Sequence, residues 1–116
     1  MKKYIIMGRI SSEYSSAMLA KPQNRRKFVE PFAESLGMKI VEFLYTGGDE
    51  TNFFSIGLAD KDEQLEALKT IVYATGNFTN MSWARAFEAD EYKEICELGK
   101  KKMETYITAM QVAGDK

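Results

Sequence analysis

The sequence predicts an α+β fold in which a four-stranded antiparallel sheet carries helices on one face. In the 116-residue chain, segments alternate as strand, helix, strand, strand, helix, strand, before a long helical pattern at the end. Residues 38–58 contain two short apolar strands around a glycine-containing turn. Both of these strands carry apolar side chains on both faces, so both sides of the sheet need a cover.

The first strand and the connection after it occupy residues 3–20. Residues 3–10 favour a strand, and Gly8 within it indicates a bend or the close approach of another group. Residues 11–20 predict a connection with a helical turn, which Ser12 is placed to cap.

A helix is expected after Asn24, and Gly37 stops it at Leu36. Pro31 lies inside the apolar stripe of this helix and removes one backbone hydrogen bond. We therefore expect a kink at Pro31 or a break of the helix into two pieces.

The hairpin pairs residues 40–45 with residues 52–59. Gly47 and Gly48 permit positive φ, so the link between the two strands can turn tightly. In residues 40–45, simple alternation of side chains places Ile40, Glu42 and Leu44 on one face and Val41, Phe43 and Tyr45 on the other.

The second helix and the last strand complete the pattern. Asp60 and Glu63 resemble a capping box for a helix that runs to about Thr75. Residues 79–87 favour a fourth strand, and one face of this strand carries Met81, Trp83, Arg85 and Phe87.

This order of elements is the split βαβ, or ferredoxin-like, arrangement. Its two helices cover one face of the sheet, and the other face remains apolar and bare. A chain of this size has too few helices to cover both faces. We expect a second copy of the chain to cover the second face, because symmetric dimers are the commonest oligomers.

A long C-terminal helix is predicted over residues 88–112. Its apolar residues recur at alternating spacings of four and three, as in a short coiled-coil seam. The helix either packs on its own domain or reaches a neighbouring subunit. We expect residues 1–99 to form the ferredoxin-like barrel domain, and residues 100–116 to form an extension of the last helix with a mobile tail after Val112.

Composition excludes several classes of function. The charges nearly cancel, 16 basic against 17 acidic, so we expect no binding to nucleic acid or to a membrane. The absence of histidine excludes Ser-His and Cys-His catalysis and histidine-ligated zinc or haem. The single cysteine, Cys96, allows no internal disulfide. Without a signal peptide or a membrane span, we expect a cytoplasmic protein, and we assign no metal, cofactor or catalytic residue.

Three segments resemble the GYD-domain family. Residues 4–9, Tyr-Ile-Ile-Met-Gly-Arg, are similar to the Tyr-Ile-(apolar)-(apolar)-Gly-Lys start of that family. Residues 22–26 resemble its Ser-Pro-x-Arg segment, and residues 76–87 resemble its Gly-Asn strand. The resemblance covers about residues 3–98 and implies a dimeric α/β barrel, in which two four-stranded sheets pack face to face.

The sequence departs from the family at the motif that names it. Where the family has Gly-x-Tyr-Asp, this chain has Gly-Asp-Glu-Thr-Asn at residues 48–52. Thr51 stands for the tyrosine and Asn52 for the aspartate, so this chain lacks the carboxylate of that motif. The wider superfold includes cofactor-free oxygenases, haem degraders, isomerases and ligand binders, and fold alone does not choose among them.

Four residues are candidates for a binding pocket. Arg85 and Trp83 share a strand face and offer a cation and a stacking wall in a barrel interior; alternatively, Trp83 is core and Arg85 pairs with a carboxylate such as Glu42. Tyr45 and Asn52 either hold a ligand or bond to backbone. The cations Arg9, Arg25, Arg26 and Lys27 predict a solvated face rather than a phosphate site.

The leading functional hypothesis is a homodimer that binds a small, mainly apolar or aromatic molecule in or beside the barrel. A cofactor-free oxygenase or isomerase that uses the same cavity is the second hypothesis. A purely structural dimerisation module with a filled barrel is the third. An apolar pocket with one or two polar anchors favours the first, a carboxylate that faces a tyrosine or asparagine favours the second, and a sealed interior favours the third.

Overall fold

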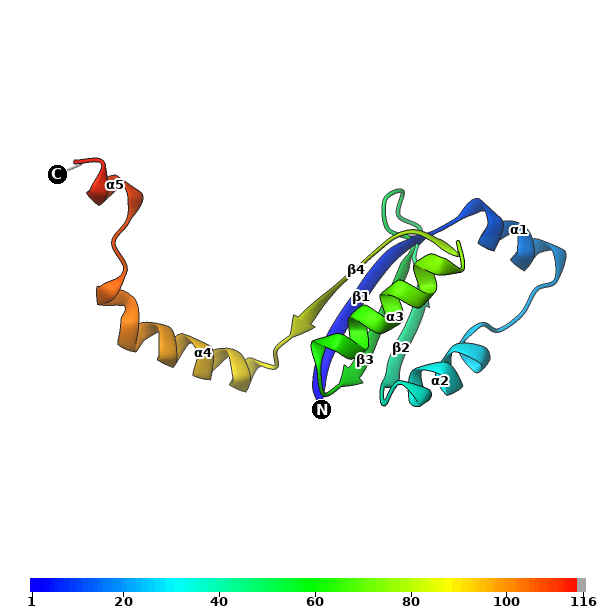
Figure 1. The fold of residues 1–116 in the computed structure, drawn as a ribbon, viewed down its shortest axis with the longest axis horizontal. Coiled ribbons are helices and arrows are strands. Elements are labelled where there is room, and N and C mark those ends of the chain that lie inside the picture. Colours follow the sequence, from blue (N-terminus) through cyan, green and yellow to red (C-terminus); the bar gives the residue numbers. More distant parts are fainter. Residues whose placement is uncertain (115–116) are drawn as a thin grey trace. The chain divides into compact units, whose positions relative to one another are not determined.

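The computed structural model describes residues 1–114 and confirms the predicted α+β fold (Figure 1). The chain forms two compact units, one that ends at Ala86 and one that begins at Phe87. The first unit contains β1 (Lys2–Ile10), α1 (Ser12–Ala20), α2 (Arg26–Ser35), β2 (Lys39–Tyr45), β3 (Phe53–Ala59), α3 (Asp62–Ala74) and β4 (Phe78–Ala86).

The four strands form one antiparallel sheet in the order β2-β3-β1-β4. The first strand therefore lies in the centre, although it comes first in the sequence. Together with the helices between the strands, this order is consistent with the ferredoxin-like arrangement. The expectation for Gly8 is confirmed, because this residue faces the Asn80 carbonyl of β4 with no room for a Cβ atom.

A bulge in β2 changes the predicted faces of the hairpin. Ile40 pairs with Gly57, but Glu42 pairs with Ile56, so β2 contains one extra residue at Val41. Ile40 therefore lies on the same face as Phe43, and the predicted grouping of Ile40 with Glu42 is wrong. Simple alternation fails here because a bulge shifts the two-residue period by one.

One face of the sheet packs against α2 and α3 and forms the core of the first unit. Tyr4 and Leu65 are the largest side chains that are fully buried there. The Tyr4 hydroxyl donates a hydrogen bond of 2.7 Å to Asp62 Oδ1 at the start of α3, which ties the central strand to that helix. Figure 1 shows α3 running along the sheet, and the core also takes in Ala33 from α2.

The opposite face of the sheet is apolar and open within the first unit. It carries alternate residues of β1 and β3, because side chains of neighbouring strands that pair directly point to the same side. Met7 on this face is 37% exposed and Leu44 is 46% exposed. We call this surface the open face, and its central residues are Ile5, Met7, Phe54, Ile56 and Leu58.

The helix boundaries differ from prediction in two places. Residues 12–20 form a complete helix, α1, and its cap is Ser11 rather than Ser12, because the Ser11 hydroxyl accepts a hydrogen bond from the Tyr14 N–H. The helix α2 continues through Pro31 and does not break into two pieces.

The cap of α3 also differs from prediction. The Gln64 side chain, rather than Glu63, accepts hydrogen bonds of 2.8 and 2.9 Å from the N–H groups of Asp60 and Lys61. The Gln64 amide also donates a hydrogen bond of 2.7 Å to the Leu36 carbonyl, so this one side chain connects the ends of α2 and α3.

The second unit contains α4 (Ala89–Lys102), η1 (Met103–Thr105) and α5 (Ala109–Val112). The prediction of one helix to Val112 is wrong beyond Lys102. Thr108 starts a new helix there, since its side chain and that of Gln111 cap each other's backbone N–H groups. The mobile tail expected after Val112 falls partly on residues 115–116, outside the described residues, and the division into 1–99 and 100–116 stays a prediction.

Replacing Gly8 by alanine tests the close approach of β1 and β4. An added Cβ would lie 2.6 Å from the Asn80 carbonyl oxygen, so one strand must move. We expect Gly8→Ala to lower the free energy of unfolding by about 1–3 kcal/mol in urea titrations. Gly47→Ala is the matched control, because a Cβ at Gly47 meets nothing within 4 Å; an equal loss in both variants would contradict the close approach.

Candidate functional site

A cavity of about 260 Å³ lies between the helix-covered face of the sheet and the three helices of the first unit. Its floor includes Ser55 of β3, which has a small side chain, and Gly57, which has none, so both leave space that larger residues would fill. Its walls are mostly apolar and aromatic, and they include Phe28, Phe32, Phe43, Phe53, Phe78 and Leu68. Such a mixture of apolar walls and few polar groups is typical of small-molecule sites.

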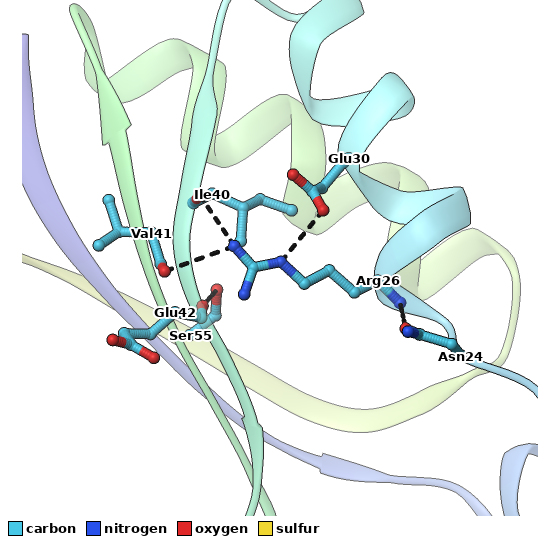
Figure 2. A network of polar contacts seen from close by, with 7 residues as sticks. All are labelled: Asn24, Arg26, Glu30, Ile40, Val41, Glu42 and Ser55. Carbon is cyan, nitrogen blue, oxygen red and sulfur yellow. Dashed lines mark hydrogen bonds and ion pairs between the residues drawn. The ribbon is translucent and has the colours of Figure 1, made fainter.

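The helix α2 forms one wall of the cavity, and hydrogen bonds from Arg26 connect this helix to β2 (Figure 2). Arg26 Nε donates to Glu30 Oε1 at 3.1 Å, and Nη2 reaches the carbonyls of Ile40 and Val41 at 3.4 and 3.5 Å. Neighbouring carbonyls in a regular strand point in opposite directions, so the bulge at Val41 is what lets one guanidinium contact both.

The polar end of the cavity contains Tyr14 and Arg25. The Tyr14 hydroxyl forms a hydrogen bond with the hydroxyl of Tyr45, and its ring packs edge-on against Phe78. Burial raises the pKa of Tyr14, the hydrogen bond with Tyr45 adds to the rise, and the Arg25 guanidinium opposes it. Arg25 also donates a hydrogen bond of 2.8 Å to Gln23 Oε1.

Two of the predicted site residues lie at the hairpin. Tyr45 is the last residue of β2 and lies on the helix-covered face. Its hydroxyl forms a hydrogen bond with the Tyr14 hydroxyl, but Tyr45 does not itself line the cavity. Asn52 lies just before β3. Its side-chain Oδ1 accepts a hydrogen bond of 2.8 Å from the backbone N–H of Ile10, and its backbone N–H donates to the Gly8 carbonyl. Asn52 therefore extends the pairing of the central strands.

The other two predicted residues lie on β4. Trp83 packs edge-on against Tyr4, with ring centroids 5.7 Å apart, and its N–H donates to Glu66 Oε1 at 2.6 Å. Arg85 lies opposite Tyr4 in the register of the neighbouring strands β4 and β1, on the same face as Trp83. The alternative pairing of Arg85 with Glu42 is wrong within one chain, because the two residues lie on opposite edge strands and opposite faces.

The structure thus brings Trp83 and Arg85 together, and it places Tyr45 and Asn52 at the other edge and end of the sheet. A ligand role for these four residues stays a prediction. Sequence reasoning missed Tyr14, because the segment after Ser11 was expected to be mostly a connection.

The solvated face predicted for the basic residues is wrong for Arg25 and Arg26, which are partly buried against the cavity wall and β2. Only the bulge and the packing of α2 reveal their positions, and neither has a signal in the sequence.

Neither a metal-binding cluster nor a membrane-spanning helix lies within residues 1–114. Within residues 1–114, no three Cys, Asp or Glu side chains gather in a group that could hold a metal ion. In the same part of the chain, every helix is too short or too polar to cross a lipid bilayer.

The raised pKa of Tyr14 predicts how stability depends on pH. Its ordinary value is 10.0, so the unfolded chain loses this proton first as pH rises, and the stabilisation falls as pH increases above about 10. We expect Tyr14→Phe to flatten the fall of the unfolding free energy with pH in alkaline urea titrations. Phe32→Leu, which removes packing but no phenol, is the control; an unchanged slope in Tyr14→Phe would contradict the assignment.

Comparison with known proteins gives the family. The model of the GYD domain matches residues 4–96 of the chain, which include most of β1, all of β2, β3 and β4, and every residue that lines the cavity. A comparison with curated proteins found no match. Because the family model spans most of the 116 residues, the chain belongs to the GYD-domain family.

Proposed function

We propose that this GYD-domain protein is a homodimer that binds a small, mainly apolar molecule in the cavity between its sheet and its helices. The cavity itself carries this proposal, because it has a volume of about 260 Å³ and mostly apolar walls. A cavity of roughly 150 Å³ accommodates benzene. The volume here therefore suits a molecule of about one or two rings.

The lining favours binding over catalysis. No aspartate or glutamate is among the described residues that line the cavity, so a carboxylate that faces a tyrosine or asparagine is not part of it. Tyr14, Ser55 and Thr75 carry the hydroxyl groups of the lining. Ser55 already donates a hydrogen bond of 2.7 Å to the Glu42 carbonyl, and Thr75 donates one of 2.6 Å to the Val72 carbonyl. An oxygenase or isomerase would need a proton acceptor, and the described lining residues include neither a carboxylate nor a histidine for that role.

The open face supports the homodimer. Ile5, Met7 and Ile56 form its centre, and water would contact these apolar side chains in a lone first unit. Membership of the GYD family supports a second copy as the partner, since the resemblance implies two sheets packed face to face. A symmetric dimer buries the same surface on both copies.

Binding to the cavity is tested with toluene and indole as probes. We expect both to bind the wild type in calorimetric or NMR titrations, and Gly57→Val to weaken binding at least tenfold, because its side chain occupies the floor of the cavity. The variant is expected to fold, since an added Cβ lies no closer than 3.4 Å to its neighbours.

Ser82→Val is the matched control for this experiment. It adds a valine on a strand residue of the open face, away from the cavity, and it should bind the probes as the wild type does. Failure of both probes to bind the wild type, or equal binding by Gly57→Val, would rule out the proposed site.

The dimer is tested by sedimentation velocity. We expect the wild type to sediment at twice the chain mass at micromolar concentration, and Met7→Glu to be monomeric, because a buried unpaired charge is costly. Leu19→Glu, on α1 and 83% exposed, should remain a dimer. A monomeric wild type would refute this part of the proposal.

A further inference from the structure

We propose that the ligand of the cavity is an aromatic carboxylate, whose anionic group binds at Arg25 and whose ring occupies the apolar part. This inference rests on the proposed function, because it names the chemical class of molecule that the same cavity takes. Three features support it: the charge of Arg25, the hydroxyl pair of Tyr14 and Tyr45, and the aromatic residues of the cavity walls.

The Arg25 guanidinium is half-buried at the polar end of the cavity, and its nearest partners are neutral. It donates to the amide oxygen of Gln23 at 2.8 Å, and it lies 5.4 Å from the centroid of the Phe28 ring. Within residues 1–114, no carboxylate lies within 4.0 Å of it. A partly buried cation without a counter-ion attracts an anion, because bringing opposite charges together offsets its lost hydration.

The hydroxyl pair adds a hydrogen-bond donor close to this cation. Tyr14 and Tyr45 share one hydrogen bond, which uses the hydrogen of one hydroxyl and leaves the other hydrogen available. Burial keeps Tyr14 in its neutral, donating form over a wide pH range by raising its pKa. A carboxylate at this end would accept from both the guanidinium and the remaining hydroxyl hydrogen.

The apolar walls indicate that the anion carries an aromatic ring. Phe28, Phe32 and Phe43 line the space beyond Arg25, and aromatic side chains pack well against the faces and edges of a flat ligand. A small hydrophilic anion such as phosphate would leave this surface unused. The guanidinium, a planar fork of N–H donors, matches the two oxygens of a carboxylate.

The test compares cinnamate with cinnamamide, which has nearly the same shape but no charge. We expect isothermal titration at neutral pH to show that the wild type binds the acid at least tenfold more tightly, about the effect of one charge-assisted interaction. This preference should weaken as sodium chloride is added.

Arg25→Met should remove the preference while leaving the binding of cinnamamide in place, and the retained binding shows that the variant is folded. Lys27→Met is the matched control: it removes the same charge two residues away, at an exposed position that does not line the cavity, and should keep the preference. If Arg25→Met does not fold, Arg25→Gln with circular dichroism serves the same comparison.

The outcomes separate the two proposals. Equal affinity of the wild type for acid and amide would overturn the carboxylate assignment and leave the apolar site intact. A preference that survives in the folded Arg25 variants would overturn the role of Arg25. If toluene, indole and both cinnamoyl compounds fail to bind, the proposed function itself falls.

Discussion

The structure depends on the burial of one face of a four-stranded sheet under two helices. Tyr4 lies at the centre of this packing, fully buried, and bonded through its hydroxyl to the start of α3. Its position on the central strand lets it contact Trp83 on the next strand as well. Since a small domain has little apolar surface to bury, the stability of the first unit concentrates on this layer.

The same layer is not completely filled. Ser55 and Gly57 are too small to reach the helices, and the gap that they leave is the cavity. An unfilled apolar space lacks dispersion contacts and costs stability, whereas a ligand that binds only the folded state restores them and adds stability by mass action. The proposed ligand would fill this gap, and the hydrogen bonds from Arg26 to β2 hold the α2 wall of the cavity in place.

Much of the fold could be predicted because its signals are local. The helix stop at Gly37, which has a positive φ, and the two-residue period of the strands outside the β2 bulge depend on residues a few positions apart, and the structure follows them. The prediction of a tight glycine turn is wrong, because neither Gly47 nor Gly48 has a positive φ and the link between β2 and β3 spans residues 46–52. The site was harder to predict. Trp83 and Arg85 share a face as predicted, but the cavity lies nearer the other edge strand. Arg25, which lines the cavity together with a second cation, Lys39, comes from a segment expected to be solvated.

The sequence by itself determined the class of fold, the order of its elements and the open apolar face, because these follow from side-chain periodicity and turn chemistry. Only the tertiary structure decided the extra residue at Val41, the end of the last long helix at Lys102, and the meeting of Tyr14, Arg25 and Tyr45. Those features depend on how strands align and on how residues far apart in the chain compete for partners. The periodicity of a single segment contains no information about contacts between distant residues.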